Sequence, residues 1–261
     1  MKRVLTALVL VPFTVYTIFF GPQWFFILVA TAMAALCFFE FSGLVEANGI
    51  EPPGLAGGLL GVTMMFDVSF IRLVAIGSLL LAMRLKDLAS AMAHAAATVL
   101  GAAYIFGAWR CAIDLRAIHP NWIFYAVAIN WAGDIAAFYT GKAFGKHKLA
   151  PRISPAKTWE GTLGSIAAAV VFGLAFRHWL LPQVPLWGMV ALSIVTNIAG
   201  QLGDLTESAL KRGAGVKDSG TMLPGHGGWL DRLDSNLFTL PVVYTALMFL
   251  NRSASFLTGR W

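Results

Sequence analysis

The stretch from Gln23 to Val45, QWFFILVATAMAALCFFEFSGLV, contains a single charged residue, Glu40. It is long enough to cross a bilayer as one helix, because about 20 consecutive apolar residues span the hydrocarbon core. Similar apolar runs recur along the 261-residue chain, which is 58% hydrophobic and 12% charged and has a mean hydropathy of +0.72. A soluble core could not cover so much apolar surface, so the sequence predicts an integral membrane protein.

Nine apolar segments, separated by Gly, Pro and charged residues, predict an all-α polytopic fold. We expect the spans at Val4–Phe20, Gln23–Val45, Gly54–Phe66, Ser69–Met83, Ala91–Ile113, Trp122–Phe144, Trp159–Leu181, Leu186–Leu210 and Ser235–Leu250. The third and fourth are short, and one long bent helix or a re-entrant pair is the alternative for them. We divide the chain into N-terminal transmembrane helices (1–114) and a catalytic transmembrane region (115–261).

The Lys and Arg residues are distributed unevenly between the two sides that nine spans define. With a cytoplasmic N-terminus, the opposite side receives only Arg72, Arg110, Arg116, Arg177, Arg252 and Arg260. The rest of the 19 Lys and Arg residues fall on the cytoplasmic side, together with the polar loops 145–158 and 211–234. A net charge of +6 without a basic stripe fits anionic lipid headgroups or phosphates, and not nucleic acid.

Five carboxylates lie inside or at the edge of the expected spans, where ionisable residues are costly and often functional. They are Glu40, Asp134, Glu160, Asp204 and Glu207. We expect Glu40 to be a structural residue that extends toward the cytoplasmic interface. For Asp134, a hydrogen bond between helices and a place in a polar cavity are equally good interpretations.

The segment GDLTESALKR, at the end of the eighth span, places several polar residues on one helix face. Asp204, Glu207 and Ser208 stand at positions i, i+3 and i+4, and Lys211 continues the same face. Ionic side chains that share a face at the end of a span are candidates for a common site at the membrane surface.

Two further aspartates, Asp231 and Asp234, stand one turn apart at the start of the ninth span. If they meet Asp204, three carboxylates come together, and such a group needs a cation to remain ionised. A ligand set of oxygens alone favours Mg²⁺, so we expect Asp204, Asp231 and Asp234 to bind it. The alternative is that the two aspartates complement the helix dipole, or pair with Arg232 and Lys211.

Both polar loops contain groups that suit phosphate. The glycines of Pro224–Gly228 let main-chain N–H groups approach a ligand closely. In that segment His226 has three open roles, which are donating to a phosphate, transferring a proton and holding the loop. In the other loop Lys157 stands at the start of a helix and is the preferred phosphate ligand, whereas Lys146 and Lys148 are typical of any basic cytoplasmic loop.

These motifs resemble the signature of the phosphatidate cytidylyltransferase (CDP-diacylglycerol synthase) family. The matching residues are Ser208, Lys211, Arg212, Lys217, Asp218, Leu223 to Gly228, and Asp231 to Asp234. The stretches GDLTES and SPAKTWEG are also similar to the family, so the resemblance covers at least residues 134–235. Trp229 replaces an aliphatic residue of the signature, and Ala156 stands where the family often has a second Lys.

The resemblance implies an enzyme that joins CTP to phosphatidic acid, giving CDP-diacylglycerol and pyrophosphate. It implies that Asp204, Asp231 and Asp234 hold Mg²⁺, and that Lys157 and Lys211 act in catalysis with them. The substrate-binding residues expected besides these two lysines are Ser154, Thr158, Arg212, Lys217, Asp218, His226, Gly227, Gly228 and Arg232. It also allows a second, monovalent cation and a homodimer, and it suggests a multi-pass protein of the bacterial inner membrane.

Two other functions are weighed against this one. A cytidylyltransferase that acts on a different lipid phosphate would carry the same motifs. A transporter would place ionisable residues at mid-membrane in symmetric halves. The charge of this chain instead clusters on one side and in one half, which disfavours a transporter.

Overall fold

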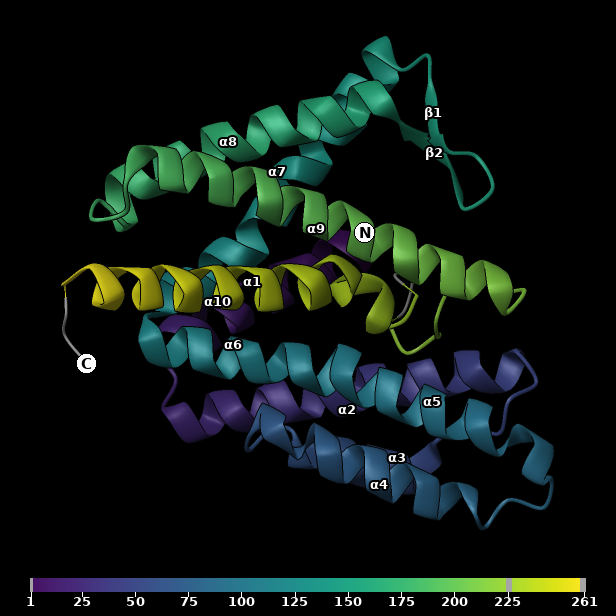
Figure 1. Cartoon of the computed structure of the whole chain (residues 1–261). Helices are drawn as coiled ribbons and strands as arrows, with labels where there is room; N and C mark the ends of the chain where they lie inside the picture. The colour runs from purple at the N-terminus through teal and green to yellow at the C-terminus, as the bar shows by residue number, and fades with distance from the viewer. Residues whose placement is uncertain (1, 224–226, 259–261) are drawn as a thin grey trace.

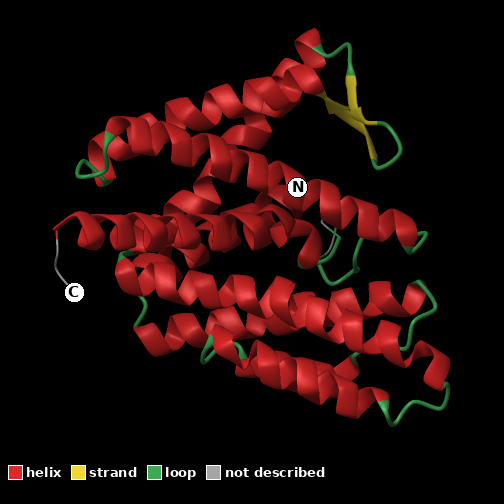
Figure 2. Ribbon diagram, viewed as in Figure 1, coloured by secondary structure: helices red, strands yellow, loops and turns green. Residues whose placement is uncertain are grey.

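The computed structural model describes residues 2–223 and 227–258, and these residues are mostly helical (Figure 2). The long helices are α1 (Lys2–Phe19), α2 (Gln23–Ala47), α7 (Pro120–Phe144), α8 (Trp159–Leu180), α9 (Leu186–Gly213) and α10 (Leu230–Thr258). The shorter helices are α3 (Gly54–Thr63), η1 (Val68–Phe70), α4 (Ile71–Ala82), η2 (Leu88–Ser90), α5 (Ala91–Gly101), η3 (Ala102–Phe106) and α6 (Gly107–Ile118). The helices lie side by side as a bundle (Figure 1).

The prediction of an all-α polytopic membrane protein is confirmed. In the part of the chain that the structure describes, five helical segments are long and apolar enough to cross a membrane. They are Gln23–Ala47, Leu88–Ile118, Trp159–Leu180, Leu186–Gly213 and Leu230–Leu250. The helix α7 is also 25 residues long, but its inner residues include Asn130 and Asp134.

The third and fourth expected spans form two separate helices, α3 and α4, which pack against each other. They contain 10 and 12 residues. At 1.5 Å per residue, helices of this length cover only about half of a hydrocarbon core of about 30 Å. The single bent helix that was the alternative for this region is therefore excluded, and the two short helices depend on their neighbours for burial.

Short connections between successive helices bring distant polar segments to one end of the bundle. The segment 145–158, expected only as a loop, contains an antiparallel hairpin of β1 (Lys148–Ala150) and β2 (Ser154–Thr158). In Figure 1 this hairpin lies at the same end of the bundle as the C-terminus of α9 and the N-terminus of α10. Thr158 then begins α8, because its side-chain oxygen accepts a hydrogen bond from Gly161 N–H at 3.1 Å.

Polar side chains join the helices α7 to α10 within the bundle. Asn130 donates to Asn236 at 2.9 Å, which links α7 to α10. Asn197 donates to Ser165 at 2.9 Å, which links α9 to α8. In a lipid environment the hydrophobic effect does not drive helices together, so such hydrogen bonds and close packing of small residues determine the arrangement.

Two arginines expected on the opposite side from the polar loops bind main-chain carbonyl groups. Arg110 donates to Met65 O at 2.9 Å, and Arg116 donates to Ile18 O at 2.9 Å. These oxygens lie at or near the ends of helices, where carbonyl groups lack partners within the helix. The two side chains therefore fasten connections between helices at that end of the bundle.

The boundary that we drew after residue 114 falls inside α6. The helix α10, from the second region, packs against α6 and α2 of the first. Buried apolar residues of both regions form one hydrophobic cluster. The division therefore marks where the motifs lie, and not two separate cores.

We predict that Gly203→Ala destabilises the bundle. A Cβ atom at Gly203 would lie 2.7 Å from the main-chain oxygen of Asp234, where α9 and α10 cross closely. Overpacking of this kind typically costs about 1–3 kcal/mol, more than the roughly 1 kcal/mol that Ala gains over Gly in a helix. The matched control is Gly43→Ala in α2, where a Cβ atom would meet nothing within 4 Å. Thermal unfolding in detergent should show a lower Tm for Gly203→Ala only; equal Tm values would contradict the close contact.

Candidate active site

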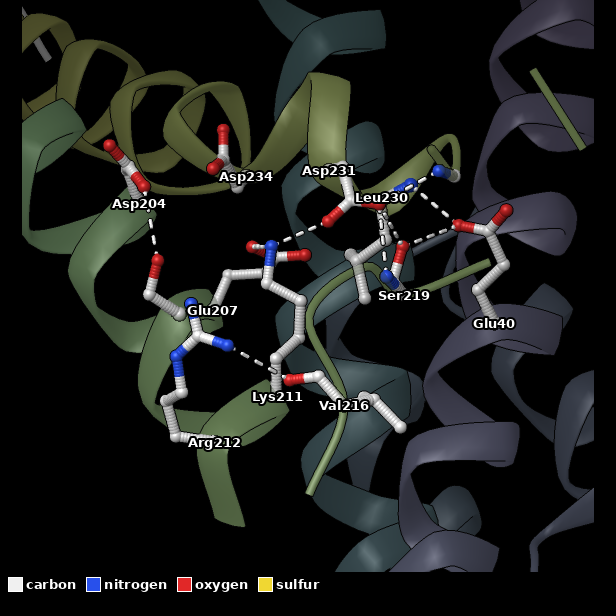
Figure 3. Close-up of polar contacts among 12 residues, drawn as sticks. Glu40, Asp204, Glu207, Lys211, Arg212, Val216, Ser219, Leu230, Asp231 and Asp234 are labelled. Carbon is white, nitrogen blue, oxygen red and sulfur yellow. Dashed lines mark hydrogen bonds and ion pairs between the residues drawn. The ribbon is translucent and has the colours of Figure 1, made fainter. Parts of the chain in front are cut away.

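The predicted polar face of α9 is confirmed, and Lys211 is its centre (Figure 3). The Nζ atom of Lys211 lies 2.5 Å from Oε2 of Glu207 and 2.5 Å from Oδ1 of Asp231. The side chain of Lys211 is 11% exposed, that of Asp231 is 6% exposed and that of Glu207 is fully buried. One cation thus contacts two carboxylates that are largely removed from solvent.

Glu207, one of the five carboxylates singled out in the sequence, was not among the expected catalytic or metal-binding residues, yet it is part of this site. Its carboxylate makes the ion pair with Lys211, and neither of its oxygens has a hydrogen-bond partner among the described residues. A buried carboxylate is tolerated only when a cation compensates its charge. The i to i+4 spacing of Glu207 and Lys211 was the signal that could have identified the pair.

Asp231 is held by the loop that precedes α10. Its Oδ2 atom accepts hydrogen bonds from Ser219 N–H at 2.9 Å, Gly228 N–H at 2.7 Å and the Ser219 hydroxyl at 3.0 Å. Together with the ion pair to Lys211, these contacts employ both of its oxygens (Figure 3). The alternative in which Asp231 pairs with Lys211 is thus the arrangement that the structure contains.

The expectation that Glu40 extends toward the membrane interface is wrong. Glu40 is only 3% exposed, and it points from α2 toward the start of α10 (Figure 3). Its carboxylate accepts hydrogen bonds from the N–H groups of Trp229 at 3.0 Å and Leu230 at 2.8 Å, and from the Ser219 hydroxyl at 3.0 Å. No local sequence pattern indicated this contact, because Glu40 and Leu230 are 190 residues apart in the chain.

A second ion pair lies beside the first, at a polar cavity of about 230 Å³. The Nζ atom of Lys157 is 2.5 Å from Oδ2 of Asp204. The cavity is lined by both of these residues and by Asp134, Thr158 and Ser235, among others. Of the two interpretations of Asp134, the place in a polar cavity is therefore confirmed.

Two of the three expected metal ligands approach each other. Asp204 and Asp234 lie side by side on α9 and α10 (Figure 3), and Asp134 lines the same cavity as Asp204. Asp231 points instead toward Lys211. Within residues 2–223 and 227–258, no group of three or more His, Cys, Asp or Glu side chains is placed to hold a metal ion. The three-aspartate metal site thus remains a prediction, although paired carboxylates are suitable donors for a hard cation.

A model of the cytidylyltransferase family matches residues 1–250 of this chain. This chain belongs to that family. The phosphatidate cytidylyltransferase of Bacillus subtilis (strain 168) is 34% identical over 261 residues, covering 94% of this chain and 97% of that protein. The Staphylococcus aureus (strain COL) protein of the same name is 35% identical over 219 residues, covering 83% of each. A protein of that name from Haemophilus influenzae (strain Rd) is 45% identical over 123 residues, covering 46% of this chain and 43% of its own length.

The other residues expected from the family signature do not take part in the ion pairs of Lys157 and Lys211. Arg212 is exposed and donates to Val216 O at 3.2 Å and to Ile153 O at 3.5 Å, so it joins α9 to the hairpin segment. Lys217 and Asp218 are exposed, and Thr158 has the capping role in α8. Arg232 lines a different cavity of about 250 Å³.

Four more residues lie in the two polar loops or, for Glu160, directly after one of them. Ser154 lies in β2 and is half-buried. Gly227 has a φ of +78°, a conformation that favours glycine. The prediction for His226 lies outside the described residues. Glu160, at the start of α8, pairs with the His147 ring at 2.7 Å and so fastens the hairpin.

We predict that Lys211→Met strongly destabilises the protein. The substitution leaves Glu207 buried without its cation, which typically costs about 3–5 kcal/mol. Adding Glu207→Leu to Lys211→Met should recover part of that loss, because an apolar pair of similar size replaces the buried pair of Glu207 and Lys211. Asp231 then keeps only its hydrogen bonds to Ser219 and Gly228. Thermal unfolding in detergent would measure both effects. If Lys211→Met alone is as stable as the unmodified protein, the substitution does not leave an uncompensated charge buried.

Proposed function

We propose that this chain transfers the cytidylyl group of CTP to phosphatidic acid, giving CDP-diacylglycerol and pyrophosphate. The names of the Bacillus subtilis and Staphylococcus aureus relatives support this reaction. The observation that carries the proposal is the pair of lysine–aspartate contacts, Lys157 with Asp204 and Lys211 with Asp231, at one end of a membrane bundle. Both substrates are anionic phosphates, and lysines at the membrane edge suit their binding.

The chemistry needs positioning and charge neutralisation more than it needs a base. A phosphate oxygen of phosphatidic acid attacks the α-phosphorus of CTP, and a new P–O–P linkage forms. The bond between the α- and β-phosphates breaks, and its electron pair leaves with pyrophosphate. The attacking oxygen is already anionic near neutral pH, so stabilisation of the phosphate charges by Lys157 and Lys211 contributes to the rate.

The aspartates now paired with these lysines acquire a second role in the reaction. When CTP phosphates bind Lys157 and Lys211, Asp204 and Asp231 lose their cationic partners. A divalent cation bound with the nucleotide would take their place. We propose that Asp204 and Asp234 hold Mg²⁺, and that Asp231 joins them after it separates from Lys211. Bound Mg²⁺ offsets the negative charge of the phosphates and of the departing pyrophosphate. A second, monovalent cation stays a prediction of the family resemblance.

The acyl chains of the acceptor have a suitable place beside this polar group. A groove of about 700 Å³ between α2 and α3 is lined mainly by apolar residues and ends at Ser219–Met222. Phe39 and Leu55, which line it, are 67% and 81% exposed, so the groove opens on the surface that faces lipid. The acyl chains of phosphatidic acid would enter there from the bilayer, with the phosphate near the loop.

We further propose that the protein lies in a bacterial inner membrane with its N-terminus and its active site in the cytoplasm. The excess of Lys and Arg at the end of the bundle that holds the two ion pairs supports this orientation. CTP would then arrive from the cytoplasm, and phosphatidic acid from the same leaflet. A homodimer remains a prediction.

The central test of the proposed function uses purified protein, labelled CTP, Mg²⁺ and a panel of lipid phosphates. We expect the unmodified protein to form CDP-diacylglycerol, and Asp231→Asn and Asp234→Asn each to reduce that rate by at least about 100-fold. The matched control is Asp67→Asn, since Asp67 is an exposed carboxylate that only caps η1. Absence of any CDP-lipid from the unmodified protein would refute the function. Full activity of both variants would refute the site.

The groove is tested with Gly58→Leu. Gly58 lines the groove, and a Cβ atom there would make an ordinary contact with Phe38 at 3.5 Å. A leucine side chain at this position would therefore occupy part of the groove. We expect the KM for phosphatidic acid to rise several-fold while the KM for CTP stays within about twofold, because only the lipid uses this space. An unchanged KM for the lipid would exclude the groove as its binding place.

A further inference from the structure

Glu40 connects the N-terminal part of the chain to the loop that carries the signature residues. It lies in α2, is 3% exposed and accepts hydrogen bonds from Trp229, Leu230 and Ser219. Among residues 2–223 and 227–258, none forms an ion pair with this carboxylate. Its charge is therefore stabilised by donors of the loop and of the first turn of α10.

The position of Glu40 at the start of α10 has a clear physical basis. The first N–H groups of a helix have no partner within the helix, and the helix dipole favours a negative charge there. A local Ser, Thr, Asp or Asn usually supplies the acceptor. Here the N–H groups of Trp229 and Leu230 are satisfied by the carboxylate of another helix. Glu40 thus determines where α10 begins relative to α2.

Ser219 contacts both Glu40 and Asp231 and so links the two carboxylates. Its hydroxyl oxygen lies 3.0 Å from Oε2 of Glu40 and 3.0 Å from Oδ2 of Asp231, and its main-chain N–H donates to the same oxygen of Asp231 at 2.9 Å. A serine hydroxyl has one proton, so it donates to one carboxylate at a time. The two acids are therefore coupled through a single side chain.

The glycines of the loop show how closely it fits around Glu40. A Cβ atom at Gly220 would lie 2.6 Å from Oε1 of Glu40, and a Cβ atom at Gly228 would clash with Oε2. Gly220 and Gly228, on either side of the loop, thus both pack against the Glu40 carboxylate. Only residues without a side chain allow this approach, which ties the glycine pattern of the signature to a residue in the other half of the chain.

We propose that Glu40 is a positioning residue for Asp231. It fixes the first turn of α10 and, through Ser219, holds the Asp231 carboxylate in the orientation that meets Lys211. The role in catalysis rests on the proposed cytidylyl transfer, whereas the role in holding the loop does not depend on it.

The kinetic test compares Glu40→Gln with Glu51→Gln in the purified full-length protein. Both substitutions replace a glutamate by glutamine in the N-terminal part of the chain, but Glu51 is exposed, lies outside the lining of the groove and makes none of the loop contacts. In Glu40→Gln an amide NH₂ group faces N–H or O–H donors, so part of the constraint on the loop is lost. We expect kcat for CDP-diacylglycerol formation to fall about 10- to 100-fold, with KM for CTP changed less, and Glu51→Gln to stay within about twofold of the unmodified protein.

Coupling through Ser219 is tested with Ser219→Ala, Ser219→Thr and the double variant Glu40→Gln/Ser219→Ala. Ser219→Ala should lower kcat, Ser219→Thr should keep most of it, and the double variant should lose little more than Glu40→Gln alone. Effects that simply multiply would overturn the coupling. If Glu40→Gln does not fold, the comparison of Ser219→Ala with Ser219→Thr still decides whether the hydroxyl matters.

A proteolysis test distinguishes this proposal from the proposed function. Arg212 and Lys217 are exposed and flank the loop on its N-terminal side. We expect trypsin to cleave Glu40→Gln near these residues about tenfold faster than the unmodified protein or Glu51→Gln, because the loop is released. Unchanged cleavage and unchanged kcat would overturn the positioning role. If no variant and not even the unmodified protein forms CDP-lipid, the function fails, but the cleavage rates still decide whether Glu40 holds the loop.

Discussion

The pairing of Lys211 with Glu207 and Asp231 is the interaction on which the polar end of the bundle depends. Glu207 is fully buried in a helix of a membrane protein, where an unpaired carboxylate is very unfavourable. Lys211 must therefore stay with Glu207 even when its ammonium group binds a phosphate, and before substrate binds it also contacts Asp231 at the start of α10. The ion pair consequently fixes the end of α9 against the start of α10, next to the close contact at Gly203. The cavity at Lys157 and the loop around Asp231 both lie beside this junction.

Local patterns in the sequence were sufficient for the helices and for one face of the site. Apolar runs predicted the long helices, and the spacing of Asp204, Glu207 and Lys211 predicted their shared face, because both follow from helical periodicity. The β-hairpin was not predicted, since its two strands are three and five residues long. The role of Glu40 was not predicted either, because its donors lie in the other half of the chain. Long-range contacts of this kind depend on helix packing, which a single sequence does not encode in any local spacing.

Lys157 and Lys211 form ion pairs with carboxylates and are also the proposed ligands of phosphate. Without substrate, Lys157 and Lys211 neutralise Asp204 and Asp231. With substrate, phosphates compete for the lysines and leave the aspartates available to a cation. Charges of both signs are therefore kept balanced before and during binding, which limits the cost of holding so many ionisable groups near a bilayer. Membership of the cytidylyltransferase family fits this arrangement, since the proposed reaction brings two polyanions together.

The contact between Glu40 and the start of α10 also has a consequence for the order of biosynthesis. The ribosome completes α2 long before α10, so the Glu40 carboxylate enters the membrane before its main-chain donors have been made. Until the last helix inserts, that acid has to be solvated by water or by other polar groups near the membrane surface. Closure of the loop is therefore a late event in assembly, and a nascent chain that stops before Leu230 carries a polar defect in α2. Such a defect distinguishes an unfinished protein from a complete one.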